Sequence, residues 1–214
     1  LSANTTASNN TGLGYFALAA NTTGAFNVSL GAFTLDANTT ASHNTGIGYN
    51  SLSANTTGTR NVALGSLALD ANTTANDNTA IGYEALGANT TGDLNTAVGQ
   101  GALTANTTGA SNDAFGGNSL DANTTGSFNV ALGRSALSAN TTANSNTAVG
   151  HAALAANTTG ANNTALGFAA LDAAILPSSN TSIGSASLSV NVHSSRNTAV
   201  GSNSLESHNL ASAG

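Results

Sequence analysis

The stretch that decides the fold is a 17-residue unit, which reads NTTGTRNVALGSLALDA at residues 55–71 and NTTANDNTAIGYEALGA at residues 72–88. With the first Asn counted as offset zero, the unit has the form N-T-T-[GA]-x-x-N-[TV]-A-[LIV]-G-x-x-A-L-x-A. A second Asn recurs at offset six in twelve successive units, from Asn10 to Asn197, without insertion or deletion. Since loops tolerate insertions, a constant length implies that each residue stacks on its equivalent in the next unit.

Strict repetition of a short unit is typical of a solenoid. The unit is too short for two helices and a turn, and its regularly placed Asn, Thr and Gly disfavour helix. It contains two short extended segments, at offsets seven to nine and thirteen to sixteen, separated by turn residues. The sequence therefore predicts an all-β fold, a parallel β-solenoid (β-roll) with one coil per repeat. Regular coils are predicted over residues 1–173, and degenerate coils that continue beyond the last residue over 174–214.

Each offset has a predicted direction, because alternate residues of a strand point to opposite sides. The large apolar residue at offset nine is predicted to face inward, together with offset seven. On the second segment, Leu at offset fourteen and Ala at offset sixteen are predicted to face inward, and the variable offset fifteen outward. Offsets eight and thirteen stay small, as in Ala63 with Ala68 and Ala97 with Ala102. They are predicted to face outward against another chain, because solvent would not require a small residue.

Repeated Asn, Gly and Leu are expected to build the corners and the core. Asn and Gly tolerate left-handed backbone conformations, and stacked Asn side chains can form an amide ladder along the axis. The predicted structural positions are Asn10, Asn27, Asn44, Asn61, Gly14, Gly31, Gly48, Leu18, Leu35 and Leu52.

The composition excludes several classes of function. Of 214 residues, only nine are Asp or Glu and three are Lys or Arg, which gives 6% charged residues and a net charge of −6. So few cations cannot neutralise a run of phosphates, so no nucleic-acid partner is expected. No stretch approaches ~18 consecutive apolar residues, so no membrane contact is expected in this segment. The chain has no Cys, which excludes disulfides and thiolate metal sites.

Residues with catalytic or metal-binding chemistry are not repeated together. The four His occupy four different offsets, so they cannot stack into a ligand cluster. The four Asp at offset fifteen never lie on adjacent coils, so they offer no paired carboxylate for Ca²⁺ binding or acid–base catalysis. We therefore expect no enzyme activity, no metal and no cofactor. Arg60 and Asp77 share offset five on neighbouring coils and are predicted to pair.

The phrase N-[TV]-A-[LIV]-G-x-x-A-L-x-A resembles the head repeat of trimeric autotransporter adhesins. It is also similar to the N-T-A-[LIV]-G-x-x-A-L…N-T-T-G repeats of phage-tail-fibre-like and bacterial surface proteins. The resemblance covers residues 1–205, and the unit here is longer than the adhesin repeat by a corner that contains Asn-Thr-Thr. It implies a left-handed β-roll, a homotrimer or longer filament, and a structural or adhesive role outside the cell, on a cell or virion surface, with a host surface or glycan as the external partner.

The Asn-Thr-Thr array leaves two alternatives open. Asn at offset zero and Thr at offset two are predicted to face the same side, which would give an uncharged grid comparable to that of ice-binding solenoids. Each Asn-Thr-Thr is also a sequon for N-glycosylation, although glycans on every coil, ~4.8 Å apart, would collide. The residues concerned include Asn4, Asn21, Asn38, Thr6, Thr23 and Thr40.

Tyr15, Tyr49 and Tyr83 share offset eleven on alternate coils. Rings spaced by two coils, ~10 Å, could stack against sugars. The other interpretation is that this row is left from a 34-residue duplication, because alternate coils also tend to share the patterns TTA…NT and TTG…NV.

Overall fold

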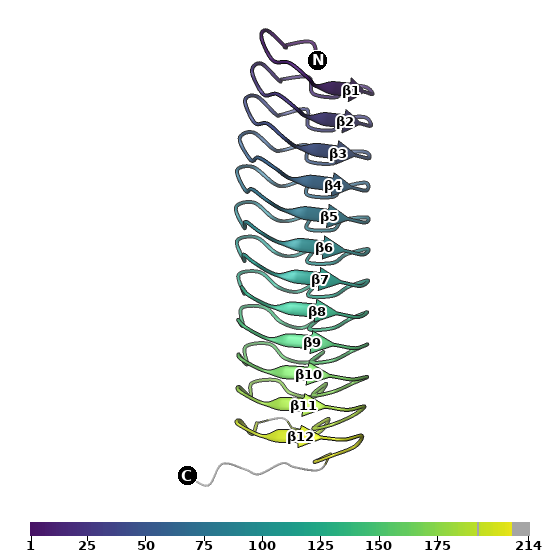
Figure 1. Cartoon of the computed structure of the whole chain (residues 1–214), viewed down its shortest axis with the longest axis vertical. Helices are drawn as coiled ribbons and strands as arrows, with labels where there is room; N and C mark the ends of the chain where they lie inside the picture. Colours follow the sequence, from purple (N-terminus) through teal and green to yellow (C-terminus); the bar gives the residue numbers. More distant parts are fainter. Residues whose placement is uncertain (192, 207–214) are drawn as a thin grey trace.

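The computed structural model describes residues 1–191 and 193–206, which form a straight stack of coils (Figure 1). Each coil contributes one three-residue strand, and the strands pair in sequence order into a single sheet. The strands are β1 (Thr11–Leu13), β2 (Val28–Leu30), β3 (Thr45–Ile47), β4 (Val62–Leu64), β5 (Thr79–Ile81), β6 (Thr96–Val98), β7 (Asp113–Phe115), β8 (Val130–Leu132), β9 (Thr147–Val149), β10 (Thr164–Leu166), β11 (Thr181–Ile183) and β12 (Thr198–Val200).

Every pair of neighbouring strands is parallel and joins residues that are one repeat apart. Between β5 and β6, for example, Thr79 pairs with Thr96 and Ile81 with Val98, a separation of 17 residues. The same register continues into β11 and β12, in the part of the chain where the repeat sequence is degenerate. These pairings confirm the predicted parallel β-solenoid with one 17-residue coil per repeat.

The second predicted strand, at offsets thirteen to sixteen, is replaced by overlapping turns in the described coils. In the coil that follows β5, the amide of Ala85 donates to the Gly82 carbonyl at 3.4 Å, and the amide of Gly87 to the Glu84 carbonyl at 3.2 Å. Glu84 and Leu86 have φ angles of 54° and 53°, the conformation that tight turns of this kind require. These consecutive turns form one side of the coil, which we call the turn wall, and the strands form the strand wall. The prediction of a strand was wrong because a short Ala-Leu-x-Ala segment is compatible with such turns as well as with a strand.

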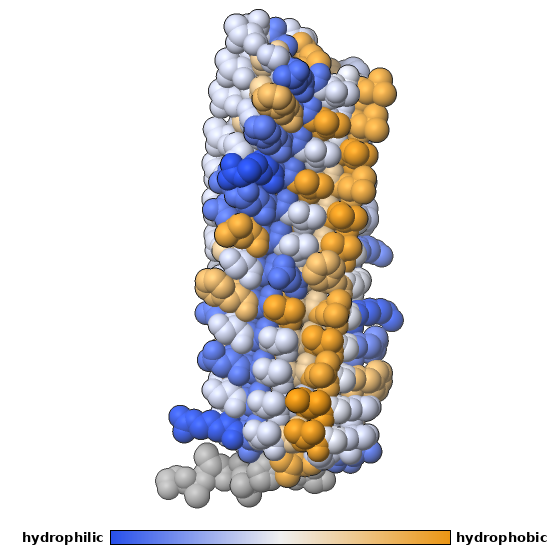
Figure 2. Space-filling model, viewed as in Figure 1, coloured by the Kyte–Doolittle hydropathy of each residue, from blue (hydrophilic) through white to orange (hydrophobic). Residues whose placement is uncertain are grey.

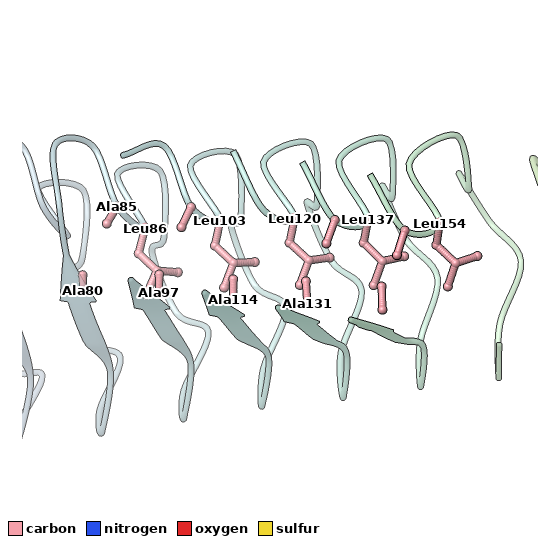
Figure 3. Packing of buried hydrophobic residues seen from close by; sticks show 14 of the residues in the cluster. Ala80, Ala85, Leu86, Ala97, Leu103, Ala114, Leu120, Ala131, Leu137 and Leu154 are labelled. Carbon is pink, nitrogen blue, oxygen red and sulfur yellow. The ribbon is translucent and has the colours of Figure 1, made fainter. Parts of the chain in front are cut away.

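The core contains one large side chain per coil, a leucine. Leu at offset fourteen is completely buried in eleven coils, from Leu18 to Leu188, as predicted. Each Leu reaches from the turn wall toward the strand wall, where the alanines of offset eight face it (Figure 3). Leu103 and Ala97 illustrate this arrangement, in which one large residue and small residues opposite fill the whole width of the coil.

The predicted facing of the strand was wrong. Ala63 at offset eight and Ala68 at offset thirteen are both 0% exposed, whereas Leu64 at offset nine is 44% exposed. The Leu of the turn wall leaves room only for small residues opposite, so the core itself requires Ala at these offsets. The predicted seam for a second chain at offsets eight and thirteen is therefore wrong. Ala at offset sixteen, predicted to face inward, is only half-buried, as at Ala54.

Two ladders of asparagine amides close the coil at its corners. At offset zero, the Asn38 Nδ2 donates to the Asn21 Oδ1 at 2.8 Å and to the Ala41 carbonyl at 3.1 Å. At offset six, the backbone amide of Asn44 donates to the Asn27 Oδ1 at 2.9 Å. The same pattern recurs from coil to coil, which confirms the predicted amide ladders.

Left-handed backbone occurs at offsets other than those of the Asn residues. Gly at offset ten has positive φ as predicted, for example 141° at Gly14, 137° at Gly31 and 130° at Gly48. The residue before the second Asn takes a positive φ in place of the Asn, as at Asp77 with 59°. The core Leu does so as well, and at Leu18 φ is 50°. The Asn side chains are required for the ladder, so assigning the left-handed turn to them was wrong.

The offset-zero ladder is interrupted at Ala174. The Oδ1 of Asn157 is buried without a hydrogen-bond partner, because the equivalent residue one coil further on lacks an amide. We expect Ala174→Asn to raise the free energy of unfolding by about 1 kcal/mol, the net value of one restored hydrogen bond, in urea denaturation. Ala174→Asp is the control, because it has the same shape but no N–H donor, and it should destabilise. Equal stability of the Asn and Asp variants would contradict the explanation.

Candidate interaction surface

The outer face of the sheet carries a row of large apolar side chains that continues through all twelve strands. They occupy offset nine, and their exposure reaches 66% at Leu13 and 67% at Val200. Offset seven lies beside it and holds Thr or Val in every strand except β7. We call the offset-nine row and the valines of offset seven the apolar stripe. Its members are Leu13, Leu30, Ile47, Leu64, Ile81, Val98, Phe115, Leu132, Val149, Leu166, Ile183 and Val200, with Val28, Val62 and Val130.

The apolar stripe is continuous and straight. Figure 2 shows a hydrophobic column along the whole rod, a second column in which hydrophobic and paler residues alternate, and a hydrophilic column beyond it. Single exposed apolar residues are normal on proteins. Eleven steps of ~4.8 Å give a stripe ~50 Å long, and a width of ~12 Å makes its area about 600 Å², at the upper end for monomers. Patches of this size are often functional.

The predicted tyrosine row is exposed, and two of its members, Tyr15 and Tyr49, belong to a larger aromatic cluster. Tyr15 and Phe33 have ring centroids 5.3 Å apart, and Phe33 and Tyr49 have centroids 6.2 Å apart. Phe16 stacks on Phe33 at 5.9 Å. Tyr83 lies two coils further along and is also exposed, and the Glu84 carboxylate beside it raises its pKa. Sequence reasoning missed the two Phe residues, although both occupy offset twelve, next to the Tyr offset, in adjacent coils.

Asn and Thr of the Asn-Thr-Thr segment point to opposite sides of the chain. Asn21 and Asn38 are completely buried, whereas Thr23 and Thr40 are exposed; in the first coil Asn4 is exposed as well. The predicted common face of Asn and Thr was therefore wrong, and within this segment the exposed row consists of the Thr at offset two. The Asn Nδ2, the atom that N-glycosylation modifies, is enclosed in the amide ladder at Asn21 and Asn38.

Charged groups are sparse. The Arg60 Nε and Nη2 donate to the two carboxylate oxygens of Asp77 at 2.6 and 2.8 Å, which confirms the predicted pair. This hydrogen bonding lowers the pKa of Asp77, whereas partial burial raises the pKa of Asp36 and Asp172. Within residues 1–191 and 193–206, no three His, Cys, Asp or Glu residues are placed to hold a metal ion. The same part of the chain contains no helix with the length and hydropathy of a membrane span.

Comparisons of the chain with protein-family models, with curated proteins and with solved structures found no match. The class of molecule is therefore defined by geometry: a β-solenoid repeat protein with a core of Leu and Ala, asparagine ladders at its corners and one apolar outer face.

Proposed function

We propose that this chain is a non-enzymatic, structural segment of an extracellular fibre on a cell or virion surface, in which solenoids lie side by side as a homotrimer. The observation that carries the proposal is the apolar stripe. The resemblance of the repeat to adhesin heads and to tail-fibre-like proteins supports the same assembly, with the contact on the offset-nine side of the sheet.

The dimensions of the apolar stripe suit an interface between copies. Three stripes of about 600 Å² each, meeting on the axis of a trimer, would bury about 1,800 Å² in total, which lies within the range of stable protein–protein interfaces. The surface is nearly free of charge, as interface cores are. At offsets seven and nine, the two rows of the outer face, every strand except β7 has only uncharged residues.

The mechanical role follows from the ladders. Backbone hydrogen bonds run along the axis in the strands and also in the turn wall, where the amide of Leu86 donates to the Ala102 carbonyl at 3.0 Å. Each coil adds ~4.8 Å of length, so the number of repeats sets the reach of the segment. Adhesion to a host surface or a glycan would use groups outside the stripe, and the aromatic cluster around Phe33 is the surface we propose for that contact.

Charge placed on the apolar stripe tests the proposal. We expect the wild type to be a trimer in light scattering coupled to size-exclusion chromatography at micromolar concentration. Leu64→Lys with Leu132→Lys should be monomeric, because each Lys would have to be buried without a partner. The matched control is Thr57→Lys with Thr125→Lys, which adds the same charge to the same two coils on an exposed row away from the stripe. A monomeric wild type, or a stripe variant that remains trimeric, would refute the proposal.

A further inference from the structure

The apolar stripe is almost identical from coil to coil. Eleven of the twelve described strands have Thr or Val at offset seven and an aliphatic residue at offset nine. A neighbouring copy displaced by one coil, ~4.8 Å, would therefore still place aliphatic rows on aliphatic rows. Apolar burial alone specifies the axial register only weakly when the surface repeats in this way.

The strand β7 is the exception among the described strands. It reads Asp113-Ala114-Phe115, with a carboxylate in the Thr/Val row and an aromatic ring in the aliphatic row. Asp113 is exposed, Phe115 is 40% exposed, and Ala114 is completely buried like its equivalents. Along the sheet, Asp113 is flanked by Thr96 on β6 and Val130 on β8, neither of which is charged. The strand thus departs from the repeat only on the outer face.

The relative direction of two copies decides what Asp113 meets. A rotation axis parallel to the fibre places the offset-seven row of one copy over the offset-nine row of the next, because the two rows lie side by side. In register, Asp113 of one copy would then face Phe115 of the next, whose ring edge carries partial positive charge. A two-fold axis perpendicular to the fibre would place each row on itself. At β7 it would bring carboxylate against carboxylate, and at any other height Asp113 would face an uncharged Thr or Val of the same row. The parallel arrangement is therefore favoured.

Displacing one copy along the axis by one or more coils is unfavourable in more than one layer of the interface. When copies are aligned, every Asp113 and every Phe115 falls in the same layer, and all other layers are aliphatic against Thr or Val. When one copy shifts by a coil, its Asp113 faces an aliphatic side chain of the neighbour. The carboxylate is then placed in an apolar contact without a partner, which is unfavourable. The larger Phe115 then also meets a layer that is shaped for smaller residues.

We propose that β7 sets the register of self-association: the apolar stripe binds a second copy of this chain that runs parallel and is aligned coil for coil, through Asp113 and Phe115. This inference rests on the proposed function, because it assumes assembly through the stripe. It adds the direction and the alignment of the partner.

Pulsed electron paramagnetic resonance on spin-labelled chains tests the alignment. The chain has no Cys, so one introduced Cys carries one label. Thr40→Cys and Thr142→Cys lie at the same offset on an exposed row, six coils apart. Parallel, aligned copies should give one narrow intermolecular distance that is the same for both sites. In assemblies that mix the two labelled chains, unlike sites should also be separated by ~29 Å along the axis, and the measured distance should be the hypotenuse of this axial separation and the lateral distance. An antiparallel arrangement would give different distances for the two sites and would refute the proposal.

The role of β7 in setting the register is tested by replacing its two exceptional residues with those of the consensus repeat. Asp113→Thr with Phe115→Leu should remain oligomeric but give a broadened distance distribution, with components displaced by steps of one coil. The matched control is Val130→Thr with Leu132→Ile on β8, which should keep the narrow wild-type distance. A variant of β7 that is as narrow as the wild type, or an oligomeric wild type with a broad distribution, refutes the register proposal alone. A monomeric wild type refutes the proposed function as well, so the two failures are distinguishable by light scattering.

Discussion

Gly116→Ala is expected to unfold the coils around it, whereas Gly117→Ala should leave the stability almost unchanged. A Cβ on Gly116 would lie 2.6 Å from the carbonyl carbon of Gly133, 2.7 Å from its oxygen and 2.9 Å from the amide nitrogen of Arg134. Gly116 also has a φ of 137°, which side-chain-bearing residues rarely adopt. At Gly117 the nearest atom to the same Cβ is the Gln100 carbonyl oxygen, at an ordinary 3.9 Å.

The clash at Gly116 is with backbone, which cannot move away without breaking the ladder to the next coil. We therefore expect a loss of about 4 kcal/mol or more in the free energy of unfolding, the range reserved for severe core and backbone defects. Urea unfolding followed by circular dichroism measures the loss, and hydrogen exchange should show it in the coils on both sides of the substitution. If the two adjacent Gly→Ala variants were equally stable, the close stacking of coils at offset ten would be wrong.

Asn163→Ser is expected to cost several kcal/mol through the loss of one side chain that serves two coils. The Asn163 Nδ2 donates to the Pro177 carbonyl at 2.8 Å and to the Asn146 Oδ1 at 3.1 Å. Its own Oδ1 accepts from the backbone amide of Asn180 at 3.0 Å and from the Asn180 Nδ2 at 3.2 Å. Ser is too short to replace these bonds, and partners left buried without a bond cost about 1–3 kcal/mol each, so we expect a total loss of about 3–5 kcal/mol.

The preceding residue provides the control. Asn162 is exposed and has a φ of 59°, and Ser is already present at the same offset with a φ of 60° at Ser145 and Ser179. Asn162→Ser should therefore change the unfolding free energy by less than about 0.5 kcal/mol, the ordinary range for a surface position. A loss at Asn162 as large as that at Asn163 would show that the ladder is not what the buried asparagines contribute.

The period, the parallel pairing and the amide ladders could be predicted from the sequence because they depend only on which residues recur at a fixed spacing. The inward side of the strand could not be derived in the same way. Alternation places Leu64 and Ala63 on opposite faces but does not say which face is inside, and the greater apolar area of Leu64 favoured the wrong answer. The width of the coil decides it, because Leu69 already fills the interior. A signal was present: Leu at offset fourteen does not vary in its volume, whereas offset nine varies from Val to Phe.

The interaction surface was missed for the same reason. Once Leu64 and its equivalents are outside, the residues first assigned to the core become the apolar stripe, and the small residues assigned to an interface between chains become the core. The left-handed Leu and the aromatic contact of Phe33 were outside the reach of pattern reasoning, because they depend on how the turn wall folds over the coil. The departure of Asp113 and Phe115 from the repeat is visible in the sequence, but it has meaning only after both are placed on the outer face.

The asparagine ladders also give the rod a polarity along its axis. In both ladders the amide of a later coil donates to the Oδ1 of the coil before it, as from Asn38 to Asn21 and from Asn44 to Asn27. A finished coil therefore presents its asparagine Oδ1 atoms as acceptors to the segment that follows it in the chain, beside donors such as the Asn27 Nδ2, which bonds to the Ala41 carbonyl. After one costly first coil, folding can advance coil by coil in either direction, with each added repeat finding its template already in place. A chain that emerges N-terminus first, from a ribosome or a secretion channel, could fold at the same pace at which it appears.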